Sequence, residues 1–226
     1  MLHSSDFPEL EGMRLASVTG LDELARASAK FTLPENRFHR HESKAKDARS
    51  RRGIKKLIQP ENARCIVPLL PGSPDERLHC VLRGDFVLCE LIPLIIAHRG
   101  ACSHLRVATL GLSAANAEQL ANLFTAGLIG ELTIVASHYF QQVDKTTTYR
   151  QICAILAGKA RIVITRSHAK VILLPTAGGD HYIIEGSANL RSSDNLEQML
   201  ILNDQETHDF HAGWIDDLAR DHAART

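Results

Sequence analysis

The sequence is poor in several features that mark particular classes of protein. Only 5% of its 226 residues are aromatic, and its longest apolar run covers residues 91–97. That run is far too short for a membrane span, which takes about 20 residues. The first ten residues lack an apolar core and include Asp6 and Glu9, so we expect no signal peptide. These absences argue against a membrane protein and predict a cytoplasmic one.

Cysteine is also scarce, and the five cysteines show no CxxC spacing. An odd number without that spacing favours reduced thiols over a disulfide framework or a zinc site. His208 and His211 are three residues apart in an expected helix, but no further ligand accompanies them. We therefore expect no metal and no cofactor.

The formal net charge of +0 hides an uneven distribution. Residues 37–56 contain nine Lys or Arg and two acids, so this segment is strongly basic and the remainder is acidic. We expect residues 1–60 to form a basic extension and residues 61–226 to form the main domain. Clustered cations bind nucleic-acid phosphates, although such a run is often only a solvated arm. The candidate nucleic-acid-binding residues are Arg49, Arg51, Arg52, Lys55 and Lys56.

Strand-like and helix-like segments alternate through the main domain. This alternation predicts an α/β fold in which a mixed, largely parallel β-sheet is flanked by helices. The expected strands are 85–89, 105–110, 132–137, 161–174, 182–185 and 197–203. The expected helices are 90–98, 113–126 with Ser113 as its cap, 147–156 and 205–220. Residues 43–58 also read as a short helix, and Pro68 limits 64–70 to an edge strand or a connection.

Two short polar motifs follow in the second half of the chain. His168 and Lys170 are two residues apart at an expected strand end, and so are Ser187 and Asn189. Side chains two apart in a strand share a face. Residues 176–180 (TAGGD) read as a hairpin turn, which brings the two motifs together. An imidazole, a cation, a hydroxyl and an amide at one place suit the binding and attack of a phosphate ester.

The pair His168-Ala-Lys170 and Gly186-Ser-Ala-Asn189 resembles the HxK…GSxN signature of the phospholipase D superfamily. The resemblance covers residues 80–226 and extends to Glu197, since family members place an acidic residue shortly after GSxN. One position differs, because Pro175 stands where the family has an aspartate five residues after the lysine. That aspartate is described as structural, and the nearest acid here is Asp180.

The resemblance implies a metal-independent phosphodiesterase that is similar to the family's nucleases. His168 is expected to attack phosphorus and form a phosphohistidine, while a second histidine protonates the leaving oxygen. Lys170 and Asn189 would bind the non-bridging oxygens, Ser187 would add a hydrogen bond, and Glu197 would fix the imidazole tautomer. The chain has one HxK motif, so the second histidine is expected from a second copy in a homodimer. DNA or RNA is the expected partner.

Other interpretations remain open at this point. The same fold suits a non-catalytic nucleic-acid-binding module, which the proline at 175 permits, or a lipid phosphodiesterase. Asn189 is also a common turn residue, and Glu197 an ordinary strand acid. Residues 137–139 (SHY) end an expected strand, where α/β sheets often bind ligands, but a packing role is about as plausible.

Overall fold

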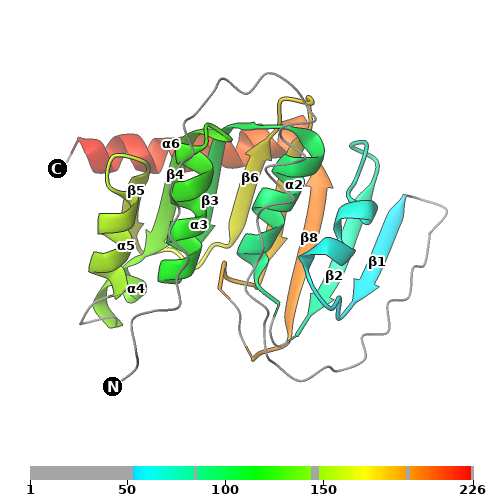
Figure 1. Ribbon diagram of the computed structural model, residues 1–226, viewed down its shortest axis with the longest axis horizontal. Helices are drawn as coiled ribbons and strands as arrows, with labels where there is room; N and C mark the ends of the chain where they lie inside the picture. Colours follow the sequence, from blue (N-terminus) through cyan, green and yellow to red (C-terminus); the bar gives the residue numbers. More distant parts are fainter. Residues whose placement is uncertain (1–52, 84–85, 144–147, 192–193, 225–226) are drawn as a thin grey trace, which may run out of the picture. The chain divides into compact units, whose positions relative to one another are not determined.

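The computed structural model describes residues 53–83, 86–143, 148–191 and 194–224. Eight strands form one sheet in the order β1-β2-β8-β7-β6-β3-β4-β5. Their pairings make the sheet mixed: six strands run in one direction, and β6 and β8 run in the other. The α/β fold with a mixed sheet between helices is confirmed (Figure 1).

The strands are β1 (Ile54–Ile58), β2 (Arg77–Leu82), β3 (Cys102–Thr109), β4 (Ile129–Ser137), β5 (Arg161–Thr165), β6 (Val171–Pro175), β7 (His181–Gly186) and β8 (Glu197–Asn203). The α-helices are α2 (Leu91–Arg99), α3 (Ala114–Thr125), α4 (His138–Val143), α5 (Thr148–Leu156) and α6 (Gln205–Ala223). Three short 3-10 helices cover Ala63–Cys65, Val67–Leu69 and Leu88–Glu90.

Two apolar layers hold the helices on the sheet. Helices α2, α3 and α5 cover one face and α6 crosses the other (Figure 1). Along β6, Ile172 and Leu174 pack into the first layer, while Leu173 packs into the second with Ile215 of α6. This alternation follows from the strand geometry and explains why β6 is apolar on both faces.

Polar contacts fix the ends and the positions of the helices. Ser113 and Asn116 form a capping box at the start of α3, as the expected cap requires. Arg106 of β3 donates from two nitrogens, each over 2.8 Å, to the Asp216 carboxylate of α6. These hydrogen bonds lower the pKa of Asp216 and attach α6 to the centre of the sheet.

Three expected elements are corrected. Residues 54–58 form strand β1 rather than part of a helix, and Leu57 is buried in the core. Residues 161–174 form two strands, because β5 pairs with β4 at the sheet edge whereas β6 pairs with β3. Residues 88–90 form a 3-10 helix in place of the end of the strand expected at 85–89.

The N-terminal boundary at residue 60 stays a prediction. Strand β1 precedes that boundary and pairs with β2, so the described sheet begins at residue 54. Most of the expected basic extension lies outside the described residues. None of the described helices combines the length and the apolar composition that crossing a bilayer takes.

Candidate active site

Both motifs lie at the same end of the central strands of the sheet. Strand β6 begins beside the end of β3, since Val171 pairs with Ala108. Strand β7 ends on this side of the sheet, and β8 begins there, with Gly186 opposite Met199. The end of β3, the start of β6, the end of β7 and the start of β8 therefore surround one location.

His168 and Lys170 lie in the connection between β5 and β6, just before β6 begins. Lys170 Nζ is 3.0 Å from His168 Nδ1 and donates to the His168 carbonyl oxygen over 2.9 Å. The expected neighbours are thus in contact, but through the lysine ammonium rather than through a shared strand face. His168 is exposed and Lys170 is half-buried.

Burial lowers the pKa of the Lys170 ammonium, and the Glu197 carboxylate acts in the opposite direction. A partly desolvated cation without a full counter-charge favours an anionic ligand. Lys170 is therefore both the partner of His168 and the natural binding group for a phosphate oxygen.

The second motif is joined to the first through the backbone. Gly186 N donates to the Lys170 carbonyl oxygen over 3.3 Å. A Cβ at Gly186 would lie 2.1 Å from the Gln198 carbonyl oxygen, so only glycine fits between β7 and β8 here. The motif therefore needs glycine at this position for a steric reason, because the backbone that leads into Ser187 passes close to β8.

Ser187 and Glu197 form a pair across the start of β8. The Ser187 hydroxyl donates to Glu197 Oε2 and accepts from the backbone N–H of Gln198 over 3.0 Å. The described contacts of Glu197 include Ser187, whereas Nδ1 of His168 contacts Lys170. The expected role of Glu197 in fixing the imidazole tautomer stays a prediction.

Asn189 is held by its side-chain oxygen. Asn189 Oδ1 accepts from the backbone N–H of Leu110 over 3.1 Å and lies 3.4 Å from the Thr109 hydroxyl. The oxygen is therefore occupied by the end of β3, and the NH2 group is the end available to a ligand. Sequence reasoning missed Thr109 and Leu110, because their only signal is their place at a strand end.

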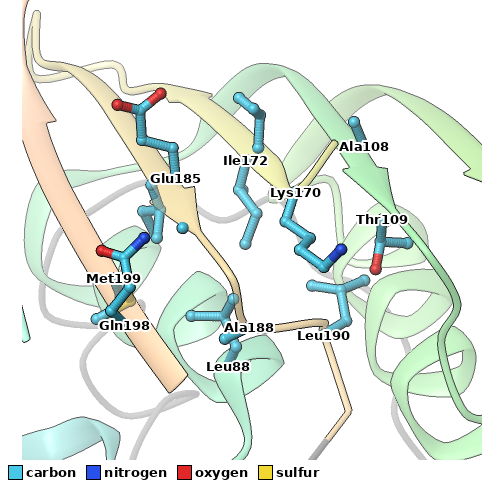
Figure 2. A pocket seen from close by; sticks show the side chains of 13 residues that line it. Leu88, Ala108, Thr109, Lys170, Ile172, Glu185, Ala188, Leu190, Gln198 and Met199 are labelled. Carbon is cyan, nitrogen blue, oxygen red and sulfur yellow. The ribbon is translucent and has the colours of Figure 1, made fainter. Parts of the chain in front are cut away.

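A pocket that is open to solvent lies between these elements (Figure 2). The polar residues Lys170, Thr109, Glu185 and Gln198 line it together with Gly186 and apolar side chains. Figure 2 shows Lys170 extending over the pocket on the side of Thr109. The lysine is thus placed where an incoming anion would meet it.

Pro175 lies at the opposite end of β6, paired with His181 of β7. Pro175 is five residues after Lys170, a distance of about 16 Å along a strand. The nearest acid, Asp180, accepts from Asn203 Nδ2 over 2.6 Å and lies 3.8 Å from Arg99 Nε. The position where the family has its aspartate therefore lies at the hairpin end of β6, away from the groups around Lys170.

Other candidate residues have local partners. Ser137 is buried and accepts from Tyr139 N over 3.2 Å at the start of α4, which is a packing and capping role. His208 contacts Asp209 over 2.9 Å, and His211 accepts from the Trp214 indole over 3.0 Å. Within the described ranges, no group of three or more His, Cys, Asp or Glu is placed to hold a metal ion.

The expected nucleic-acid-binding residues are only partly described. Arg49, Arg51 and Arg52 lie outside the described residues. Lys55 pairs with Glu76 at 3.2 Å, and Lys56 is exposed on β1. Two strands, β2 and β8, separate β1 from β7. The role of the five basic residues in nucleic-acid binding stays a prediction.

No protein-family model matches the chain, and no curated protein matches it. Among solved structures it is similar to Nuc, a phospholipase D family member from Salmonella typhimurium, with a TM-score of 0.43 and 15% identity over 53% of this chain and 80% of that one. For NucT from Helicobacter pylori the TM-score is 0.43 and the identity is 13%, and the match covers 64% of this chain and 97% of NucT. For TrmBL2, an archaeal chromatin protein, the TM-score is 0.41 and the identity is 13%, and the match covers 68% of this chain and 55% of TrmBL2.

Proposed function

We propose that the chain is a metal-independent phosphodiesterase that cleaves nucleic acid through a phosphohistidine at His168. The observation that carries the proposal is the contact set around Lys170. Its ammonium touches the His168 ring at 3.0 Å, and its carbonyl accepts from Gly186 of the second motif. One residue thus couples the nucleophile, the phosphate-binding cation and the turn that presents Ser187 and Asn189.

The reacting phosphate would lie over the pocket beside Lys170. The ammonium and the Asn189 NH2 group would bind its non-bridging oxygens, where negative charge must be balanced in the transition state. Asn189 is suited to this because its oxygen is already fixed by Leu110 N–H. Preorganised donors of this kind stabilise the developing charge without having to reorient.

The imidazole must change its hydrogen bonding before it attacks. If the Lys170 ammonium donates to Nδ1, a neutral ring carries its proton on Nε2. A bound phosphate would draw the ammonium to its oxygens, which frees Nδ1 to take the proton and leaves the Nε2 lone pair for attack. The substrate thus activates the nucleophile by replacing its partner.

The reaction then has two balanced steps. Nε2 forms a bond to phosphorus, the bond from phosphorus to the leaving oxygen breaks, and a second imidazole delivers a proton to that oxygen. Water next attacks phosphorus and gives a proton to the second imidazole, and the phosphorus–nitrogen bond breaks. A phosphate monoester is released and both imidazoles return to their starting forms.

The second imidazole is assigned to His168 of a second copy. The chain contains one HxK motif, and the His168 side chain is exposed, so it is accessible to a partner. A two-fold axis beside the site would bring the two rings to one phosphate. The basic residues Arg49, Arg51, Arg52, Lys55 and Lys56 would add backbone contacts to DNA or RNA outside the reacting centre.

His168→Ala tests the proposal directly. Cleavage of single-stranded DNA, duplex DNA and RNA is measured in excess EDTA for the wild type and the variant. We expect chelator-resistant cleavage by the wild type and at least about a thousandfold loss in the variant. Because His168 is exposed, the melting temperature should not change. His79→Ala, an exposed histidine on β2, is the matched control and should retain activity.

Two results would contradict the proposal. One is near-normal cleavage by the His168→Ala protein. The other is a wild type that shifts nucleic acid in a gel but cleaves none of it, which would favour the non-catalytic binding module. Turnover of lipid vesicles in place of nucleic acid would favour the lipid phosphodiesterase.

A further inference from the structure

A second pocket adjoins the catalytic residues on the side of β2. It is open to solvent and shares Asn189 and Glu197 with the candidate active site. Two arginines from different parts of the chain line it: Arg83 directly follows β2, and Arg191 follows Asn189 by two residues. The pocket therefore joins the reacting centre to a separate pair of cations.

The charge of this pocket is positive. Arg83 and Arg191 are both exposed, and neither has an ion-pair partner within the part of the chain that the structure describes. The one acid in the lining, Glu197, already accepts a hydrogen bond from Ser187. Two guanidinium groups beside one carboxylate leave a net positive charge that favours an anion, and their planar forks match a phosphate.

The apolar part of the lining strengthens such binding. Leu82 and Phe86 are 2% and 7% exposed, so they form a floor that cannot solvate a charge. An anion over this floor is partly removed from water, which increases its attraction to the arginines. The pocket thus combines a charged rim with an apolar floor.

The position of the pocket identifies the kind of anion. Ala188 lines both pockets, and Asn189 of the second pocket is the next residue in the chain, so a molecule whose first phosphate is beside Lys170 can place a second anion in the adjoining pocket. A polynucleotide has another phosphate one nucleotide from the one being cleaved. A phospholipid such as phosphatidylcholine has a single phosphodiester and cannot occupy both.

We infer that Arg83 and Arg191 bind the phosphate next to the scissile one, so the protein selects a nucleic-acid strand over a single phosphodiester. This inference rests on the proposed function, because it takes the phosphate beside Lys170 as the reacting one. It assigns substrate selection to two residues that neither motif contains.

Binding and turnover test the inference separately. In the first experiment, all proteins contain His168→Ala, and the affinity for a short fluorescent single-stranded oligonucleotide is measured by anisotropy in EDTA at several salt concentrations. Arg83→Gln with Arg191→Gln should weaken binding at least about tenfold and reduce the salt slope by about 0.7 for one lost phosphate contact.

The matched control is Arg77→Gln with Arg161→Gln. These exposed arginines begin β2 and β5, at the end of the sheet opposite the site, and their loss gives the same change in net charge. The control should bind the oligonucleotide with the parent affinity. Equal weakening by both double variants, or no weakening by either, would overturn the inference.

In the second experiment, the same substitutions are made with His168 intact, and kcat/KM is measured for the oligonucleotide and for bis-p-nitrophenyl phosphate. The Arg83→Gln, Arg191→Gln protein should lose at least about tenfold on the oligonucleotide and little on the small diester. An equal loss on both substrates would overturn the inference. A wild type that cleaves neither would contradict the proposed function, while the binding comparison would still decide whether the two arginines hold a strand phosphate.

Discussion

Asn189 has different roles at the two ends of one amide. Its oxygen accepts from Leu110 N–H and so attaches the second motif to the end of β3. Its NH2 group is the proposed ligand for a phosphate oxygen. The first role concerns stability and the second concerns chemistry, so substitutions that remove them one at a time can separate the two.

Asn189→Asp keeps the acceptor oxygens, removes the NH2 donor and adds a negative charge beside the phosphate. We expect near-normal stability and a loss of turnover of about a hundredfold or more. Asn189→Ala also removes the acceptor, so the free energy of unfolding should fall by about 1 kcal/mol. Chemical denaturation and EDTA-resistant cleavage measure the two effects. Normal turnover by the Asp variant would remove Asn189 from the phosphate site.

The sequence predicted the motif residues but not their contacts. His168, Lys170, Ser187, Asn189 and Glu197 were identifiable because their types and spacings form a pattern. Thr109 and Leu110 were not, because they meet Asn189 across about 80 residues of sequence and belong to no pattern. The bond from Lys170 to His168 was also hidden, since it depends on a turn that strand alternation does not describe.

At the level of elements, alternation and capping were enough to predict most of the sheet and its helices. One of the exceptions is the run 161–174, which reads as one strand because both of its ends are apolar. The structure divides it, since β5 can reach only the outer edge of β4 while β6 must pair between β3 and β7. Pairing partners are a tertiary property, and they decide where such a strand breaks.

The turn after β7 depends on Gly186, where a Cβ would meet the Gln198 carbonyl at 2.1 Å. Gly186→Ala should therefore lower the free energy of unfolding by about 1–3 kcal/mol and displace the GSxN turn, with a loss of activity. Gly213, in the middle of α6, has open space around it and is the matched control. Gly213→Ala should raise stability by about 0.5–1 kcal/mol. A Gly186→Ala protein with unchanged stability and full activity would contradict the steric role proposed for Gly186.

At the scale of the whole molecule, the proposed mechanism needs two copies of the chain. The basic segment and the single HxK motif were both visible in the sequence, but the assembly follows from neither alone. The exposed position of His168 is compatible with a shared site, and the chemistry requires a second proton donor. Activity should therefore depend on which chains are paired.

Mixing wild-type chains with an equal amount of His168→Ala protein tests this dependence. After subunit exchange, random pairing leaves each wild-type chain with a wild-type partner in about half of cases, so activity per wild-type chain should fall to about half. Light scattering should give the mass of a dimer. Unchanged activity per wild-type chain after verified exchange, or an active monomer, would show that each chain works alone.

The most direct measurement is the mass of the peptide that contains His168, taken from protein quenched during turnover. The wild type is mixed with an oligonucleotide in excess EDTA, quenched rapidly in alkali to preserve a phosphoramidate, and digested for mass spectrometry. We expect an adduct of the nucleotide, joined through its phosphorus to the His168 ring as a phosphoramidate, that is absent from His168→Ala. Turnover with an unmodified His168, or with the adduct on another residue, would contradict the proposed mechanism.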